Sequence, residues 1–228
     1  MRYLHHIIFA LCLLATCTSC RQQYLPLPPC SQFFGLCDFS TGNLIFIYDT
    51  TGMGQAIQSS TAWDSLRPVL THIAITECTD SGVYVIDATP ALGVARRTLE
   101  EFALSVMDTT AGYNFVSIAK YCFVDVPFDT ATLLERMHSL IGVPYDPYFL
   151  PNNGRLYCSE LVQECFFDLN GHHLFPYKPM NFYASDGTLP PYWQYHFDSL
   201  GVAVPQGMPG TNPNDISKSP ILHQFRIE

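Results

Sequence analysis

Cys158 is the residue whose type and position most directly suggest chemistry. It stands in residues 156–162, where a loop containing Pro151 and Gly154 gives way to apolar residues at helical spacing. In the first turn of a helix, unpaired backbone N–H groups and the positive end of the helix dipole favour a thiolate over a thiol. Cys158 is therefore a candidate nucleophile; the alternative is a small buried hydrophobic residue, as free cysteine often is. The predicted apolar stripe of this helix consists of Leu161, Val162, Cys165, Phe166 and Leu169, with Asn170-Gly171 as its predicted end.

A nucleophilic cysteine needs a base, and His72 is the candidate. It lies in residues 71–76, whose alternation predicts a strand with His72, Ala74 and Thr76 on one small, polar face. That face leaves room for another group beside the imidazole. The alternative is a strand histidine satisfied by a neighbour, because histidine is usually of intermediate burial.

The hairpin that contains His72 also contains a carboxylate. Two strand-like segments, residues 71–76 and 83–88, are separated by residues with turn chemistry, which predicts a β-hairpin. A four-residue loop would set Asp87 opposite His72, whereas a two-residue loop would set it opposite Ala74, one diagonal step away. Both registers keep Asp87 on the face of the imidazole and within its reach.

Asp87 and Glu160 are the two acids that could orient His72. A carboxylate that fixes the histidine tautomer, beside a histidine that accepts the thiol proton, is the arrangement that nucleophilic catalysis needs. Asp87 could instead be an exposed acid at the end of a strand. Glu160 lies in the first turn of the cysteine helix, where an acid commonly stabilises the helix end. The sequence therefore predicts a Cys158–His72–Asp87 arrangement.

The elements that position these residues indicate a single α+β domain. Asp129 is a possible N-cap of one helix. From residue 175 onward, prolines and aromatic residues predict an ordered wrap with little regular structure. The other predicted elements are a strand at 44–48, a loop at 50–54, a short helix at 55–66, a helix at 99–107, a strand or strand pair at 115–126 and a helix at 130–141.

The N-terminal segment predicts export and attachment to a membrane. Residues 1–19 resemble a signal peptide, with Arg2 before a short apolar core. The sequence Cys17-Thr18-Ser19-Cys20 looks like the lipobox of bacterial lipoproteins, in which Cys20 would become the lipidated first residue; a plain secretory signal is the alternative. Residues 20–40 then form the lipidated cysteine and a polar, proline-rich tether, and residues 41–228 form the domain. The predicted location is the cell envelope, with the protein lipid-anchored to a bacterial membrane.

Composition excludes several kinds of partner. The 228 residues carry a formal net charge of −9, which argues against nucleic acid as a partner and against electrostatic docking on anionic lipid.

Removal of the signal and lipidation of Cys20 would leave six cysteines, of which Cys30 and Cys37 could form a disulfide. None of these six forms a C-x-x-C pair, so a structural zinc site is not expected. No other metal or cofactor is predicted. His172-His173 is read as an exposed loop pair.

Several segments together resemble the permuted papain-like amidases, the YiiX/YaeF group of circularly permuted relatives of NlpC-type cell-wall hydrolases. The order of histidine before cysteine is what permutation implies, and Tyr157-Cys158-Ser159-Glu160-Leu161 is the most specific match. The resemblance implies an antiparallel sheet packed against the helix that bears the cysteine. The other matching segments are residues 44–46, 71–75, 85–88, 142–146 and 204–213.

The resemblance implies a role for each candidate residue. The nucleophile falls on Cys158, the base on His72 and the acidic third member on Asp87, where the family often has glutamate. An oxyanion donor is expected from the backbone N–H of Cys158, assisted by Tyr157 or Tyr48.

Three functions compete on this basis. The first is a lipid-anchored cysteine hydrolase, an amidase or peptidase that cleaves an amide bond in a small peptide, such as a peptidoglycan fragment, or in another acylated amine. The second is a lipid acyltransferase or thioesterase of the lecithin–retinol acyltransferase type, but the cysteine segment of those proteins usually reads Asn-Cys-Glu-His. The third is a catalytically inactive binding lipoprotein, for which a lost triad position would be the sign. The first is the predicted function.

Overall fold

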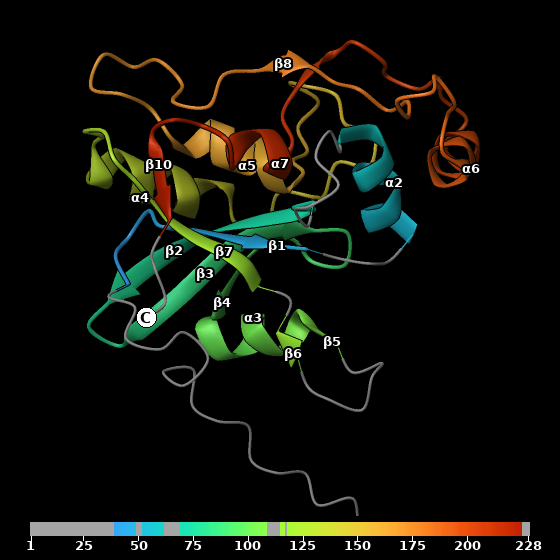
Figure 1. Ribbon diagram of the computed structural model, residues 1–228. Coiled ribbons are helices and arrows are strands. Elements are labelled where there is room, and N and C mark those ends of the chain that lie inside the picture. Colours follow the sequence, from blue (N-terminus) through green and yellow to red (C-terminus); the bar gives the residue numbers. More distant parts are fainter. Residues whose placement is uncertain (1–38, 49–51, 62–68, 109–114, 117, 225–228) are drawn as a thin grey trace, which may run out of the picture.

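The computed structural model describes residues 39–48, 52–61, 69–108, 115–116 and 118–224. Its centre is a six-stranded antiparallel sheet with the strand order β10-β7-β1-β2-β3-β4 (Figure 1). The strands of this sheet are β1 (Leu44–Ile47), β2 (His72–Thr79), β3 (Gly82–Thr89), β4 (Gly93–Thr98), β7 (Ile118–Val124) and β10 (Leu222–Gln224). Two smaller pairs are β5 (Met107–Asp108) with β6 (Phe115–Val116), and β8 (Lys178–Pro179) with β9 (Pro209–Gly210).

Helices cover both faces of the sheet. On one face lie α4 (Thr130–Leu140), α5 (Cys158–Cys165) and α7 (Pro213–Ile216), and on the other lies α3 (Leu99–Ser105) (Figure 1). Beyond the end of the sheet lie α2 (Gly52–Thr61) and α6 (Pro191–Leu200), which pack on each other. This is the α+β fold, with a sheet packed against the cysteine helix, that the sequence predicts.

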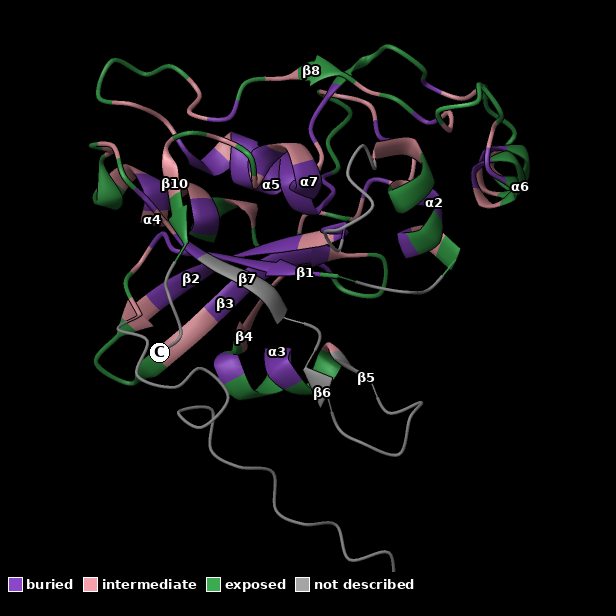
Figure 2. Cartoon of the chain, in the orientation of Figure 1, coloured by how far each residue is buried: buried purple, intermediate pink, exposed green. Residues whose placement is uncertain are grey.

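The helix that bears the cysteine is almost entirely buried. In α5 only Glu164 is not buried, which Figure 2 shows as a largely purple helix above the sheet. Leu161 and Val162 have no exposed surface, as their place in the predicted stripe requires. Leu169 is 68% exposed, so its assignment to the stripe was wrong. The reason is that α5 ends at Cys165, before the predicted stop at residues 170–171.

The hairpin of β2 and β3 adopts the shorter of the two predicted loops. Thr79 pairs with Gly82 and Ile75 with Ile86, so two residues form the turn. Continuing that register sets Asp87 level with Ala74, one diagonal step from His72. Because the step keeps both side chains on one face, the imidazole and the carboxylate can meet.

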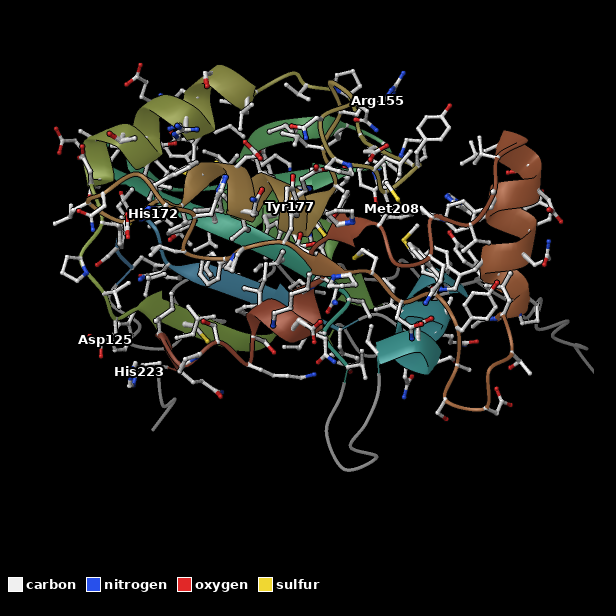
Figure 3. The ribbon with its side chains drawn as sticks, turned by 90° about the horizontal axis from the view of Figure 1, so that it is seen from above. Asp125, Arg155, His172, Tyr177, Met208 and His223 are labelled. Carbon is white, nitrogen blue, oxygen red and sulfur yellow. The ribbon has the colours of Figure 1, made fainter. Side chains whose placement is uncertain are left out.

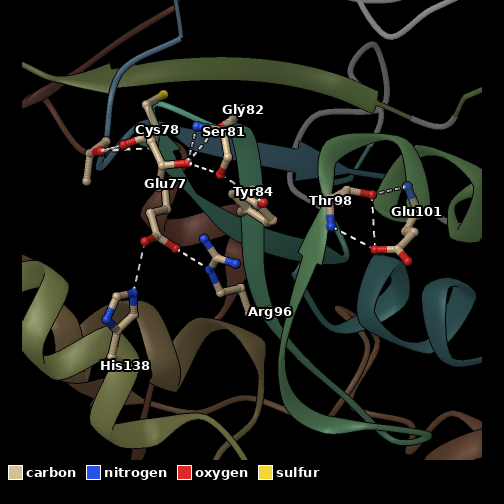
Figure 4. Close-up of polar contacts among 11 residues, drawn as sticks. Glu77, Cys78, Ser81, Gly82, Tyr84, Arg96, Thr98, Glu101 and His138 are labelled. Atoms are coloured by element: carbon tan, nitrogen blue, oxygen red, sulfur yellow. Dashed lines mark hydrogen bonds and ion pairs between the residues drawn. The ribbon is translucent and has the colours of Figure 1, made fainter.

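Capping fixes the ends of two helices. Asp129 caps α4 by accepting the backbone N–H of Ala131, as predicted. At the start of α3, the hydroxyl of Thr98 accepts the N–H of Glu101, whose carboxylate accepts the N–H of Thr98 in return (Figure 4).

A buried carboxylate joins α4 to the sheet. Glu77 of β2 accepts from Arg96 Nε of β4 at 2.6 Å, and lies 2.9 Å from His138 Nε2 of α4 (Figure 4). Burial by itself would raise the pKa of Glu77, but the bonds to Arg96 and His138 and their charges lower it. The side chain of Glu77 is only 4% exposed, so these partners compensate its loss of water.

Three parts of the structure differ from the predicted elements. Helix α2 begins at Gly52, inside the predicted loop, and is described as far as Thr61. Strand β4 carries two successive arginines and no long apolar run, so its sequence gave little strand signal. The predicted wrap contains α6, which starts with Pro191 and ends at Gly201 in the left-handed region (φ 66°).

The predictions for the signal peptide, for lipidated Cys20, for most of the tether and for the Cys30–Cys37 pair fall on residues 1–38, outside the described part of the chain. Within the described part, no helix has the length and apolar character needed to cross a bilayer. The four cysteines found there, Cys78, Cys122, Cys158 and Cys165, are all free thiols.

Candidate active site

Helix α5 brings Cys158 to the start of β2, where His72 lies. Cys158 is the first residue of the helix and is 8% exposed, and α5 packs on β2 and β3. Tyr157, the N-cap residue, makes no side-chain capping bond. Cys158 lies close enough to His72 to raise the pKa of the imidazole, through its charge and through hydrogen bonding. The two residues that sequence reasoning paired as nucleophile and base are therefore in contact.

Asp87 holds the other side of the imidazole. His72 Nε2 lies 2.8 Å from Asp87 Oδ2, which leaves Nδ1 as the ring nitrogen that faces the sulfur of Cys158. Asp87 is 1% exposed, whereas the His72 side chain is 20% exposed. The buried carboxylate thus fixes the plane and the tautomer of a ring that still reaches solvent.

The charges around His72 favour its protonated form. Burial alone would lower the pKa of His72, but the negative charge of Cys158 and the hydrogen bonds to Asp87 and Cys158 outweigh it. The result is a pKa raised from 6.5 to about 10. At neutral pH this geometry therefore favours an imidazolium beside the sulfur of Cys158.

Arg97 completes the cluster, and sequence reasoning missed it. Its Nη2 donates to both oxygens of Asp87 at 2.8 Å each, and its Nη1 donates to Ser105 Oγ at 2.7 Å. Burial by itself would raise the pKa of Asp87, but the bond to His72 and the charges of His72 and Arg97 lower it. A prediction of residues 93–98 as a strand paired with β3 would have placed Arg97 beside Asp87, but the sequence analysis did not predict that strand.

Glu160, the rival orienter, makes no contact with His72 among the described residues. Its Oε1 accepts from the hydroxyl of Tyr177 at 3.1 Å, while Oε2 is buried without a hydrogen-bond partner in the described structure. Figure 3 shows Tyr177 near the centre of the molecule, in the segment that crosses above α5. Burial, with the charges of Asp146 and Glu164, raises the pKa of Glu160 to about 8. Glu160 is thus a buried acid that holds the covering segment, not a surface residue at a helix end.

Tyrosines contribute to the wall of the cavity beside Cys158. The hydroxyl of Tyr157 accepts the backbone N–H of Thr211 at 2.9 Å, so this predicted oxyanion residue is engaged with the chain near β9. Tyr48 is 39% exposed and lines the cavity beside Cys158. Tyr145 lines it too, and its pKa is raised well above its ordinary value, first by burial and then by the charge of Cys158. Tyr145 therefore keeps its hydroxyl proton close to the sulfur, although sequence reasoning had used it only as part of a matching segment.

A cavity of about 960 Å³ opens beside these residues. Cys158, His72 and Asp87 line one part of its wall, and α2, α6 and the loop around Phe149 line the rest. Its size is at the upper end of the range of small-molecule sites, so a substrate can reach the sulfur. An enclosed, inert cysteine would have no such space beside it.

The described residues do not provide a metal site. No group of three or more His, Cys, Asp or Glu side chains in that part of the chain comes together as possible metal ligands. Of the predicted exposed loop pair, His172 is 79% exposed on its side chain and pairs with Asp168 at 3.3 Å. His173 is instead partly buried, with its Nδ1 2.8 Å from the carbonyl oxygen of Gln163, so the prediction was wrong for this residue.

Comparison with known proteins identifies a matching family and a similar fold. The family described as permuted papain-like amidase enzyme, YaeF/YiiX, C92 family, matches residues 38–225. A crystal structure of the metalloprotein YiiX from Escherichia coli O157:H7 is similar in fold, with a TM-score of 0.61 and 19% identity over 83% of this chain and 97% of that one. No curated protein matches the chain at a significant level.

Proposed function

The chain belongs to the permuted papain-like amidases, and on that basis we propose that it hydrolyses an amide bond in a small peptide or another acylated amine, with Cys158 as the nucleophile. The observation that carries the proposal is the position of His72 between the Cys158 sulfur and the Asp87 carboxylate. A cysteine, a base and a buried orienting group in contact, at the wall of an open cavity, are the parts that acyl transfer needs.

The first half of the reaction forms an acyl-enzyme. The Cys158 thiolate attacks the carbonyl carbon and forms a carbon–sulfur bond, and the carbonyl electrons move to the oxygen. As this tetrahedral intermediate collapses, the carbon–nitrogen bond breaks and His72 gives its proton to the departing amine. The products of this half are a free amine and a thioester on Cys158.

The second half regenerates the enzyme. Neutral His72 takes a proton from water, and the hydroxide attacks the thioester carbon. The carbon–sulfur bond then breaks, the acid leaves, and the imidazolium and thiolate are restored. Asp87 stays ionised throughout and stabilises each imidazolium that forms.

Two donors are proposed for the oxyanion. The backbone N–H of Cys158 lies at the start of α5, where helix N–H groups have no intrahelical acceptor. The hydroxyl of Tyr145 is the preferred side-chain donor, because Tyr145 lines the cavity and lies close enough to Cys158 for the charge of Cys158 to raise its pKa. Tyr48 remains the alternative, whereas the bond between Tyr157 and Thr211 already engages the Tyr157 hydroxyl.

No step of the proposal passes through a metal ion. YiiX is described as a metalloprotein, but the described residues of this chain do not assemble a set of metal ligands. The chemistry proposed here needs only the side chains and backbone groups named above.

The proposal also places the protein at the cell envelope. Cys20 would carry lipid, and the proline-rich residues after it would separate the anchor from the domain. Metabolic labelling with a fatty acid in bacterial cells tests this: label should appear on the wild-type protein and be absent from Cys20→Ser. Equal labelling of the two proteins would refute the anchor.

The hydrolase proposal is tested by digestion of defined substrates. Muropeptides and N-acyl amino acids are incubated with wild type and with Cys158→Ala, and the products are identified by mass spectrometry. We expect amide cleavage by the wild type alone, with Cys165→Ala, which removes another buried thiol, as the matched control. Equal cleavage by wild type and Cys158→Ala would refute Cys158 as the nucleophile. No cleavage by the wild type would refute the hydrolase and favour a protein that only binds its ligand.

A further inference from the structure

Glu160 is a buried acid, two residues after Cys158, that the proposed reaction does not use. It is the third residue of α5 and is 1% exposed. Its Oε1 accepts from the Tyr177 hydroxyl at 3.1 Å, and its Oε2 is buried with no hydrogen-bond partner among the described residues. Such a carboxyl is costly to bury as a carboxylate and much less costly to bury as a neutral acid.

Glu160 also reaches the residue before the nucleophile. Tyr157 is the N-cap residue of α5 and makes no side-chain capping bond. The Glu160 carboxyl lies close enough to the Tyr157 backbone for hydrogen bonding between them to lower its pKa. An acid at the third helical position that returns to the N-cap is one half of a capping box, which fixes the first turn of a helix. The first turn of α5 carries the Cys158 sulfur and the backbone N–H proposed for the oxyanion.

The pair of strands β8 and β9 is attached to this same turn. Figure 1 shows β8 in the segment that passes over α5. Tyr177, which donates to Glu160, comes directly before β8, and Thr211, whose N–H donates to the Tyr157 hydroxyl at 2.9 Å, comes directly after β9. The antiparallel pairing of β8 with β9 sets these two attachments side by side at one end of the pair. Side chains on both sides of Cys158 in the sequence therefore hold the pair on α5.

The contact between this pair and the helix is close. A Cβ added at Gly210 of β9 would lie 2.9 Å from the Tyr157 hydroxyl and would also overlap the Met180 side chain. Met180, which directly follows β8, and Thr211 both line the cavity beside Cys158. Movement of the β8–β9 pair would therefore change a wall of the candidate active site.

The groups that face Glu160 oppose its ionisation. Burial raises its pKa most, and the charges of Asp146, in the 145–150 loop, and Glu164, one turn further along α5, add to this. The pKa reaches about 8, although hydrogen bonding to Tyr177 and to the Tyr157 backbone lowers it. Burial and the charge of Glu160 also raise the pKa values of both tyrosines, so their hydroxyls keep their protons.

The cations on the elements around α5 are engaged elsewhere or exposed. Each of them that has a partner is bonded to a group other than the Glu160 carboxyl, so ionised Glu160 would gain no counter-charge from them. They are His72 with Asp87, His138 with Glu77, Arg136 with the carbonyl oxygen of Glu164, His173 with the carbonyl oxygen of Gln163, Lys218 with Asp215 after α7, and Lys178, which is exposed on β8.

We propose that Glu160 is a positioning residue for Cys158, which in its neutral form fastens the β8–β9 pair to the first turn of α5 and releases the pair when it ionises. This inference rests on the proposed function and adds the regulation of the same site by a proton. An ionised Glu160 regains water only when the segment above it moves away, because its side chain is buried beneath Tyr177. That movement loosens the turn that carries the sulfur and the oxyanion N–H.

The pH profile of amide cleavage tests this role. The values of kcat/KM are measured from pH 6 to pH 9 on the N-acyl amino acids and muropeptides named above. Because Glu160 titrates near pH 8, the wild type should lose about ninefold between pH 7 and pH 9. Glu160→Gln, which mimics the neutral acid, should lose less than about twofold over the same interval. A loss as large as that of wild type would overturn the proposal.

Two comparisons make that profile specific. Glu135→Gln makes the same change at an exposed position of α4 and should keep the wild-type profile. His72, whose pKa is about 10, titrates too high to account for the loss between pH 7 and pH 9. A Glu160 side chain that only filled space would leave the alkaline loss unchanged when it is replaced by Gln.

Chymotrypsin reports the position of the β8–β9 pair without any amide substrate. Cleavage after Tyr177 is followed by mass spectrometry at pH 7 and pH 9, relative to cleavage after Tyr195, which is 75% exposed on α6. At pH 9 this ratio should be at least about fivefold higher in wild type than in Glu160→Gln, and at pH 7 the two proteins should agree within about twofold. Equal ratios in the two proteins at pH 9 would overturn release of the pair.

The two proposals fail in different ways. If Cys158→Ala cleaves these amides as fast as wild type, the nucleophile is wrong and the hydrolase proposal falls, whereas the chymotrypsin ratio still decides whether Glu160 holds the pair. If cleavage depends on Cys158 but the alkaline loss persists in Glu160→Gln, the hydrolase stands and only the role of Glu160 is refuted.

Discussion

Arg97 and Asp87 form an ion pair next to His72, the candidate base. One guanidinium nitrogen of Arg97 lies 2.8 Å from both carboxylate oxygens of Asp87. Papain-like chemistry requires a polar group behind the histidine, and this pair provides one without net charge. The charges then alternate from Cys158 through His72 and Asp87 to Arg97. The pair is almost wholly buried, with 13% of the Arg97 side chain and 1% of the Asp87 side chain exposed. If one partner were removed, water could not easily take its place beside the other charge.

Replacing Arg97 should change the pH dependence of the reaction. In Arg97→Gln the cation that stabilises ionised Asp87 is lost, so the pKa of Asp87 rises. The acidic limb of the kcat/KM profile should therefore move upward by about 1 pH unit, with kcat/KM at pH 7 lowered about tenfold to a hundredfold. Arg97→Lys keeps the charge and should restore the limb. A purely structural role would instead lower activity evenly at all pH values.

The reactivity of Cys158 should depend on His72. Because the pKa of His72 is raised to about 10, the imidazole should carry positive charge beside the Cys158 sulfur throughout the neutral range. Alkylation of Cys158 by iodoacetamide at pH 7 is followed by peptide mass spectrometry. The rate in His72→Ala should be at least about tenfold lower than in the wild type, because the mutant lacks the adjacent cation.

Peptide mapping supplies the internal control for that experiment. Cys165 is buried, and burial raises its pKa above the usual range, so it should remain unlabelled in both proteins. Identical alkylation rates for Cys158 in wild type and His72→Ala would contradict an activated thiolate.

Glu160 should make the folded state less stable at alkaline pH. Its pKa is raised to about 8 by burial, so the folded protein retains a proton that the unfolded chain releases near its ordinary pKa of 4.5. Stability contributed by this group is therefore lost as pH rises from about 4.5 to about 8 and stays low above that. Glu160→Gln, which mimics the protonated acid, should unfold at a higher temperature than wild type at pH 8.5 by a few degrees, corresponding to about 1–3 kcal/mol.

The comparison at low pH decides whether that reading is right. Near pH 5, wild-type Glu160 is already neutral, so the two melting temperatures should converge. A difference between the proteins that is constant across the range would contradict ionisation of a buried carboxyl. Tyr177→Phe, which removes the hydroxyl that donates to Glu160, should reduce stability modestly, by about 1 kcal/mol.

Glu77 should affect stability without affecting chemistry. Its pKa is lowered by bonds to Arg96 and His138, so its contribution to stability is present above about pH 4.5 and is lost as the pH falls through the lower folded value. Glu77→Gln should cost about 1–2 kcal/mol at pH 7, measured by urea unfolding, because both partners are partly exposed. Its kcat/KM on a cleaved substrate should stay within twofold of wild type.

Two outcomes would contradict this assignment for Glu77. A loss of activity larger than the loss of folded protein would mean that the link between α4 and the sheet positions the site. If the stability difference between wild type and Glu77→Gln did not shrink at acidic pH, the negative charge of Glu77 would not be the source of its stabilising contacts with Arg96 and His138.

The sequence predicted most of the site because its signals are local. Alternation set His72 on one face of a strand, and either hairpin register kept Asp87 on that face, so the contact did not depend on the loop that was left open. The start of α5 was visible from the change at Cys158. Its end was not, because Phe166 leaves the helix while remaining apolar and buried.

What the sequence did not reveal depends on contacts between distant segments. Arg97 reads as a surface residue until β4 is paired with β3, and Phe149 reads as a loop residue until α6 is packed against it. The cavity is built by α2, α6 and the residue 145–150 loop, which lie far apart in the chain. Periodicity carries no information about such assemblies.

The hairpin register has one more consequence, for the order in which the protein is made. His72, Asp87 and Arg97 sit on three consecutive, hydrogen-bonded strands, all of which precede the segment with Cys158 in the chain. The reactive sulfur is therefore the last of the four groups to be synthesised.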